Sequence, residues 1–185
     1  MATNTGYIAI GKAQVSIGAY AAAGAASGSL VDVGHTKGPT TLTVTGNDYA
    51  IATEQSFGTI RKIPISASVK VKVLMDEVTL ANMRTAFRQA SGQLSTSNAY
   101  TGTLLVGDIT EQYHQVVIVT KGPAGPLGTA STRTITIYRG IIESMEEISF
   151  GKSAEQTLAV TIDCLYDDSV ATGDKFLKIN DAGGA

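Results

Sequence analysis

The stretch from residue 63 to residue 73 reads Ile-Pro-Ile-Ser-Ala-Ser-Val-Lys-Val-Lys-Val, with apolar and polar side chains in alternation. Successive side chains of a β-strand point to opposite faces, so this period of two predicts a strand with one buried and one hydrated face. The predicted buried face carries Ile63, Ile65, Ala67, Val69, Val71 and Val73. The predicted polar face carries Ser66, Ser68, Lys70 and Lys72.

A second β-prone stretch, Thr40 to Gln55, comes just before this strand. Ser56 to Lys62 contains a glycine and two adjacent cations, and it is expected to form a turn or mobile tip. The sequence therefore predicts a β-hairpin over about residues 40–75. Its strands are longer than the usual five or six residues.

A helix is predicted immediately after the hairpin, over about residues 77–91. Asp76 is expected to cap it, and Arg84 and Arg88 lie towards its C-terminal end, where positive charge suits the helix dipole. We expect the two arginines to face solvent, where acidic groups of a neighbouring molecule can reach them. The apolar residues at helical spacing are Leu80, Met83, Phe87 and Ala90.

The rest of the 185-residue chain favours strands and turns. Its 23 Thr, 14 Ser and 20 Gly are typical of short strands joined by turns. Residues 1–185 are therefore predicted to form a single, mainly β domain. Further strands are expected at 7–17, 30–33, 103–106, 115–120, 132–142, 158–166 and 176–179, with loops at 18–29, 93–102 and 122–128.

Charge and cysteine content exclude several classes of protein. The 14 basic and 16 acidic residues give a net charge of −2, which argues against a conventional DNA-binding protein. A single cysteine, Cys164, allows no intrachain disulfide, and its place in the apolar stripe of residues 158–166 predicts a buried, inert thiol. No apolar run approaches the roughly 20 residues that span a bilayer. The start of the chain has no basic residue, so a secretory signal is not expected.

Catalytic motifs are weak, and the chain is predicted not to be an enzyme. Ser149 and Lys152 have the spacing of serine acylases, but they fall at a predicted strand edge where that chemistry needs a helix start. His35 and His114 lie in different elements, and solvated or locally hydrogen-bonded imidazoles are expected there in preference to a metal site. The acid pairs 146–147 and 167–168 point to opposite strand faces, so neither forms a catalytic dyad. No cofactor is predicted.

The order of these elements resembles a known family. A strand that ends in Leu30-Val31-Asp32-Val33-Gly34-His35-Thr36-Lys37-Gly38 leads into the Thr-rich hairpin and then the single helix. The pattern Asp-x-Gly-x-Thr-x-Gly, followed by Thr41, Thr43 and Thr45, resembles the tail tube proteins of bacteriophages with long, non-contractile tails. The resemblance covers residues 7–90 best.

That resemblance implies a β-sandwich or barrel-like fold with one flanking helix and a long hairpin. It also implies hexameric rings that stack into a hollow tube, a passive conduit for DNA ejection, in which the hairpins line the lumen. The candidate contacts between subunits are Thr41, Thr43, Thr45, Phe57, Arg61, Lys62, Arg84 and Arg88.

A lumen that passes DNA must not hold phosphates, so Lys70 and Lys72 require neutralisation. We expect carboxylates on adjacent strands to pair with them, with Glu143, Asp163 and Asp167 as the candidates. With Ser66, Ser68 and the two lysines, these acids make up the predicted lumen-facing set. Merely solvated lysines are the alternative.

The implied partners are copies of the chain itself, other tail proteins at the tube ends and DNA in transit. The implied location is the virion tail, assembled in the host bacterial cytoplasm, with no membrane insertion by this chain. The alternatives are another phage structural protein (capsid decoration or minor tail), a secretion-type tube subunit, or a carbohydrate-binding β-sandwich module. The absence of Trp weakens the last of these.

Overall fold

A computed structural model describes residues 12–25, 28–52, 59–98, 101–122, 131–148, 156–170 and 173–182. Its strands are β1 (Gln14–Ala19), β2 (Val31–Asp32), β3 (Thr41–Ala52), β4 (Thr59–Met75), β5 (Leu94–Asn98), β6 (Thr101–Leu104), β7 (His114–Lys121), β8 (Thr132–Ile148), β9 (Leu158–Cys164) and β10 (Leu177–Ala182). The helix α1 is Leu80–Ala86, and short 3₁₀ turns occur at Ala22–Gly24 and Ser91–Gln93.

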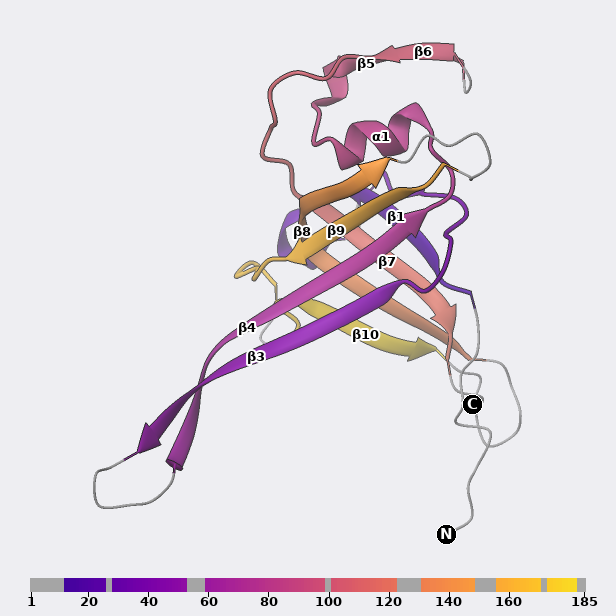
Figure 1. Ribbon diagram of the computed structural model, residues 1–185. Coiled ribbons are helices and arrows are strands. Elements are labelled where there is room, and N and C mark those ends of the chain that lie inside the picture. The colour runs from indigo at the N-terminus through magenta and orange to yellow at the C-terminus, as the bar shows by residue number, and fades with distance from the viewer. Residues whose placement is uncertain are drawn as a thin grey trace.

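Eight of the strands form one antiparallel sheet in the order β2-β1-β7-β8-β9-β4-β3, with β10 also paired to β8. The sheet curls over on itself, so that β3, β4 and β9 pass in front of β7 and β10 (Figure 1). The helix α1 and the separate β5–β6 hairpin lie together at one end. The prediction of a mainly β, sandwich- or barrel-like fold with one helix and a long hairpin is confirmed.

The 17-residue strand β8 organises the sheet. Its first half pairs with β10 and its second half with β9, so β9 and β10 lie end to end along the same edge of β8. Gly140 sits where the pairing passes from one to the other. A Cβ there would lie 2.8 Å from Ile162 Cγ2, so the close approach of β8 to β9 requires glycine.

A core of aliphatic side chains fills the inside of the curled sheet. Alternate residues of β4 and β9 supply much of it, as their sequence stripes predict. Its fully buried members include Val15, Val71, Val73, Met75, Val116, Ile137, Ile142, Leu158, Val160 and Ile162. The residue Tyr166, predicted to continue the stripe of β9, is instead half-exposed in the loop beyond the strand.

The helix is shorter than predicted. Thr79 caps it in place of Asp76, because its Oγ1 accepts a hydrogen bond from the backbone N–H of Asn82 at 3.2 Å. It ends at Ala86, and Arg88 adopts a left-handed conformation (φ 57°) that stops it. Asn82 is buried, and its amide N–H groups are satisfied because they donate to the carbonyls of Val33 and Glu77. These hydrogen bonds tie the start of the helix to the chain after β2.

Some predicted boundaries are wrong. The predicted polar loop at 93–102 contains β5 and β6, which pair as a small hairpin. The predicted tip at 56–62 is strand from Thr59 onwards, and β1 continues to Ala19 through the expected start of a loop. Strand β8 runs on to Ile148, and β10 extends from Leu177 to Ala182. The predicted strand at residues 7–11 and the Gly-Pro loop beyond Gly122 lie outside the described residues.

Candidate functional site

The long hairpin has two parts with different surroundings. From Val69 to Met75, β4 lies between β3 and β9, and it is part of the main sheet. From Thr59 to Ser68, β3 is the one strand of the described part of the chain that pairs with β4. We call this two-stranded projection, Thr45–Ala52 with Thr59–Ser68, the arm. It extends away from the body of the molecule, on the side opposite α1 (Figure 1).

Two β-bulges interrupt the arm. Asn47 pairs with Ser66 and Asp48 with Pro64, which leaves Ile65 as an extra residue on β4. A second shift leaves Ile60 unmatched between Arg61 and Thr59. Because each bulge adds one residue to one strand, it changes which residues of β4 share a face with those of β3. Beyond the first bulge, Ile63 lies opposite Tyr49. This is the same face of the hairpin that carries Thr41, Thr43 and Thr45 closer to the body of the molecule.

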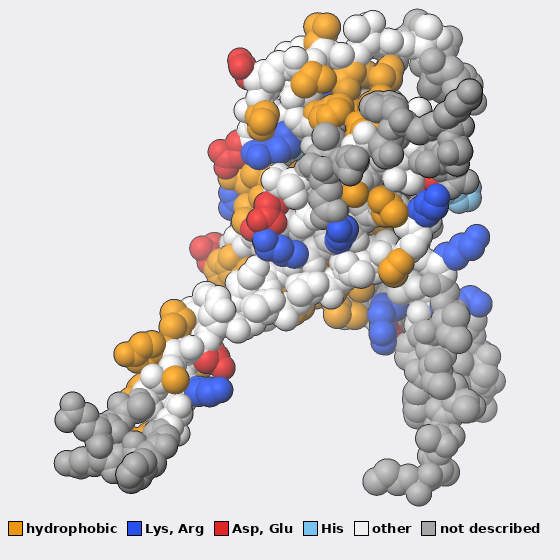
Figure 2. Space-filling view, viewed as in Figure 1, with side chains coloured by type: hydrophobic (Ala, Val, Ile, Leu, Met, Phe, Trp, Pro, Cys, Tyr) orange, Lys and Arg blue, Asp and Glu red, His pale blue; other side chains and the backbone are white. Residues whose placement is uncertain are grey.

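The predicted buried stripe is therefore correct in one half and wrong in the other. Val69, Val71, Val73 and Met75 are buried at 0–3% exposure, whereas Ile63, Ile65 and Ala67 are exposed. No layer formed by the described residues covers either face of the arm, so alternation alone does not bury it. Its exposed apolar side chains are Tyr49, Ile60, Ile63 and Ile65, with Val44 at its base. Figure 2 shows hydrophobic side chains along the arm out to its end.

The edges of the arm are also open. β3 is the last strand of the sheet, and the Thr59–Ser68 part of β4 has no partner on its other side among the described residues. Pro64 is tolerated within this strand because it lies next to a bulge and outside the central sheet. An exposed apolar hairpin with two open backbone edges is a surface on which another strand or sheet can pair.

A balanced polar surface covers the outer face of the hairpin near the body. Ser66, Ser68, Lys70 and Lys72 of β4 lie opposite Asn47, Thr45, Thr43 and Thr41 of β3. The Lys70 Nζ donates to Glu143 on β8, with a closest contact of 2.6 Å, reaching past Asp163 of β9, which lies opposite Lys70. This hydrogen bond raises the pKa of Lys70. The predicted pairing of Lys70 with a carboxylate of the set Glu143, Asp163 and Asp167 is therefore present, but Glu143 lies on β8, beyond β9, and not on an adjacent strand. The pairing predicted for Lys72 stays a prediction.

The prediction for Asp167 is wrong. Its carboxylate is 2% exposed and lies in the loop after β9, where the backbone N–H and hydroxyl of Ser169 donate to Oδ1 at 3.0 and 2.6 Å. Burial by itself would raise the pKa of Asp167. The two hydrogen bonds from Ser169, a further hydrogen bond from Tyr20 and the positive charge of Arg139 together outweigh burial, so the pKa is lowered. Asp167 therefore holds a loop in place and takes no part in the polar face.

The candidate contact residues of the hairpin fall in several places. Thr41, Thr43 and Thr45 are exposed, and they share one face with the serines and lysines predicted to line the lumen. Arg61 and Lys62 are exposed within the arm, paired with Ile51 and Ala50. Phe57 lies outside the described residues.

The two helix arginines are less exposed than predicted. Arg84, in the last turn of α1, is half-buried and lines a pocket beneath the helix. Arg88 follows the helix, and its Nε is buried with no hydrogen-bond partner. The loop over residues 105–110 is tied to the chain after the helix, because Gly107 N–H donates to Gln89 Oε1 and the Thr110 hydroxyl donates to the carbonyl of Arg88.

The Asp-x-Gly-x-Thr-x-Gly segment connects β2 to β3. Asp32 accepts hydrogen bonds from Gln14 and from the backbone of Gly34, and Glu77 accepts one from the backbone of His35 at 3.0 Å. Gly34 (φ +83°) and Gly38 (φ +74°) have conformations that other residues rarely adopt. The motif is thus a connection that brings the chain back along the end of β4, where Thr36 bridges to Met75.

The remaining candidate residues have structural surroundings. Cys164 is buried, and this burial raises its thiol pKa to about 12, as expected of an inert thiol. His114 is 9% exposed and hydrogen-bonds to the backbone of Gly18, and His35 is exposed, so the two imidazoles match the predicted locally hydrogen-bonded and solvated alternatives. Within the described part of the chain, no three His, Cys, Asp or Glu residues gather as a metal site would require. None of the helices in that part has the length and apolar character needed to cross a membrane.

Comparison with known proteins gives a distant likeness in structure and none in sequence. No family model matches the chain, and no curated protein sequence matches it. Among solved structures, it is similar to a chain in the 6-fold symmetrised cryo-EM structure of the anti-feeding prophage baseplate. That alignment has 12% sequence identity, covers 97% of both chains and has a TM-score of 0.44.

Proposed function

We propose that this chain is a structural, non-enzymatic subunit of a phage-tail-like assembly, and that it forms closed rings that stack into a tube. The observation that carries the proposal is the arm. A two-stranded hairpin is marginally stable by itself, and this one exposes large apolar side chains and two unpaired edges. Pairing each arm with the sheet of a neighbouring copy covers both features, and a closed ring leaves no arm unpaired.

The polar face of the hairpin supports a role as a conduit. Lys70, Lys72, Glu143 and Asp163 share this face and carry equal positive and negative charge. A surface on which lysines are matched by nearby carboxylates, as Lys70 is by Glu143, gains little from phosphate contacts, because counterion release requires a cation free to neutralise a phosphate. Such a surface suits a lumen through which DNA passes without being retained.

The finer parts of the proposal rest on the family resemblance of the sequence. Six subunits in each ring, DNA ejection through the tube, contacts with other tail proteins at the tube ends and a place in the virion tail are all properties of the phage tail tube proteins that it resembles. The order of strand, Asp-x-Gly-x-Thr-x-Gly connection, Thr-rich hairpin and helix supports this extension.

Negative-stain electron microscopy tests the proposal. The purified protein is expected to form rings or tubes, and the double variant Ile63→Asp/Ile65→Asp is expected to remain monomeric with an unchanged circular dichroism spectrum, because both side chains are exposed in the free subunit. The matched control is Ile109→Asp, since Ile109 is 70% exposed but lies outside the arm. Dispersed wild-type monomers at all concentrations, or normal tubes from the arm variant, would contradict the proposal.

A further inference from the structure

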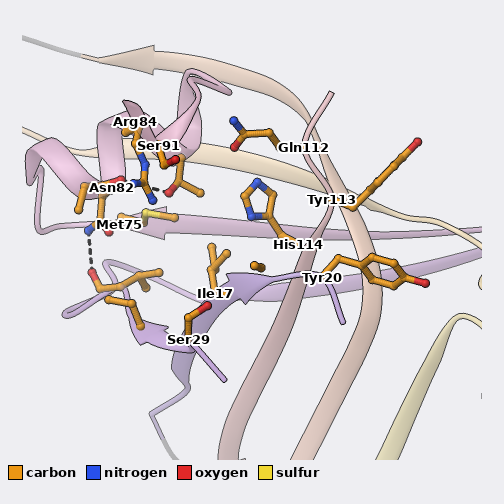
Figure 3. A pocket seen from close by; sticks show the side chains of 16 residues that line it. Ile17, Tyr20, Ser29, Met75, Asn82, Arg84, Ser91, Gln112, Tyr113 and His114 are labelled. Carbon is orange, nitrogen blue, oxygen red and sulfur yellow. Dashed lines mark hydrogen bonds between the residues drawn. The ribbon is translucent and has the colours of Figure 1, made fainter. Parts of the chain in front are cut away.

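A pocket of about 550 Å³ lies between the end of β1, the short strand β2, the helix α1 and the start of β7. Ile17, Val31, Val33 and Met75 give it an apolar lining. Asn82, Arg84, Gln112 and His114 supply polar groups, and Figure 3 shows Arg84 and His114 entering it from different elements. An apolar hollow of this size with a few converging polar groups is the usual form of a small-ligand site.

The arginine and the histidine of this pocket both have nitrogen atoms without a partner. The Nε2 atom of His114 is buried and has no hydrogen-bond partner. The guanidinium of Arg84 makes no hydrogen bond or ion pair within the described part of the chain, and no aspartate or glutamate is among the residues that line the pocket. A half-buried cation without a counter-ion is costly unless an anion from outside accompanies it.

The geometry points to a binding site for a carboxylate attached to an apolar group, and we propose that Arg84 binds the carboxylate while the aliphatic lining receives the apolar part. A planar guanidinium matches a carboxylate through two parallel hydrogen bonds. The aliphatic lining disfavours fully hydrated anions such as inorganic phosphate. The proposal depends on the pocket alone and stands whether or not the chain forms tubes.

His114 makes the site sensitive to protonation. Burial lowers its pKa and the nearby charge of Arg84 lowers it further, against a hydrogen bond to the backbone of Gly18 that raises it. Since Nε2 is the unpartnered nitrogen, it is an acceptor in the neutral ring and a donor in the protonated one. A bound carboxylate favours the protonated ring, so binding takes up a proton. The other titratable groups that line the pocket are Arg84, Tyr20 and Tyr113.

Titration with sodium benzoate, followed by NMR of the side chains of His114 and Arg84, tests the site. We expect saturable shifts of both signals that are stronger at pH 6 than at pH 8, and at least about tenfold weaker binding by Arg84→Gln, the loss expected for a charge-assisted hydrogen bond. Arg84→Lys is expected to retain part of the affinity. The control Arg133→Gln removes an arginine that instead pairs with Asp181 and is expected to bind normally.

Three results would overturn the proposal: no saturable shift with benzoate, equal binding of benzyl alcohol or inorganic phosphate, or unchanged affinity in Arg84→Gln. Because Arg84 is half-buried on the helix surface, its replacement leaves the core intact, and the unfolding midpoint of each variant checks this. An assembly assay in the presence of benzoate then identifies the source of the carboxylate. If saturating benzoate blocks assembly, a side chain of a second copy occupies the pocket; if assembly is unchanged, the ligand is a free organic acid.

Discussion

The two halves of the long hairpin have the same sequence pattern and opposite environments. Between Val69 and Met75, β4 is flanked by β3 and β9, and its odd-numbered side chains lie in the core. Between Thr59 and Ser68, the same strand has one partner, two bulges and exposed isoleucines. The difference teaches that alternation defines which side chains can be buried together, while burial itself depends on whether another layer covers that face.

Within one chain, nothing among the described residues covers the arm, and yet its sequence remains apolar. Exposed isoleucines on an open strand edge favour aggregation, and proteins usually limit this risk with charged residues or shorter edge strands. The arm has such charges in Asp48, Arg61 and Lys62, but they are interspersed with Ile60, Ile63 and Ile65. This mixture is typical of an interface that must remain soluble before it is covered.

The largest expected difference between the halves is in amide hydrogen exchange. In the unassembled protein, amides of Val69–Met75 are expected to exchange only through global unfolding, whereas those of Thr59–Ser68 exchange through local opening of a two-stranded hairpin. Since global stabilities are several kcal/mol, we expect protection to differ by about a thousandfold or more. Mass spectrometry of peptides from the two halves measures this. Equal protection in the free monomer would mean that the arm is already covered.

A matched pair of truncations gives the next largest effect. Met75→Ala removes a side chain with 0% exposure and is expected to destabilise the fold by about 3 kcal/mol. Ile65→Ala removes one with 66% exposure, and we expect a change within about 0.5 kcal/mol. Urea unfolding of the monomer compares them. A large loss of stability in Ile65→Ala would place that side chain against the body and remove the distinction between the halves.

The sequence predicts strands well where apolar alternation coincides with a covering layer. The stripes of β4 near the body and of β9 are correct because both are buried by β1, β7 and β8, and the buried thiol of Cys164 follows from its place in one of them. A carboxylate partner for Lys70 is also predictable from a lysine on a polar strand face, but the partner is Glu143 of β8, two strands away, because the long lysine side chain reaches past β9.

Other features depend on contacts distant in sequence. Asp76 has the right chemistry for a helix cap, but Thr79 takes that place because Asn82 is held by carbonyls of Val33 and Glu77. The bulge at Ile65 has no strong local signal apart from Pro64, so the sequence pattern does not predict the change of face along the arm. The pocket at Arg84 and His114 joins four elements, and only a three-dimensional arrangement reveals it.

The ion pair at the junction of the two halves gives the smallest expected effect. Lys70 lies on β4 just where β9 begins to pair with it, and its ammonium reaches Glu143 on β8. Both side chains are more than 40% exposed, so Lys70→Met is expected to lower stability only slightly, and less in high salt than in low salt because salt screens exposed pairs. Lys62→Met, on the arm, is the matched control and is expected to be neutral.

The pH dependence of this pair follows from the pKa of Lys70, which Glu143 raises above the ordinary 10.5. A base with a raised pKa in the folded state contributes its full stabilisation below the unfolded value and loses it as the pH rises through the folded one. Wild type and Lys70→Met are therefore expected to differ at neutral pH, and this difference is expected to decrease once the pH rises above 10.5. Thermal unfolding from pH 7 to 11 at low salt measures this. A difference that does not decrease at all between pH 10 and pH 11 would show that packing of the lysine stem, and not its charge, joins the arm to the body.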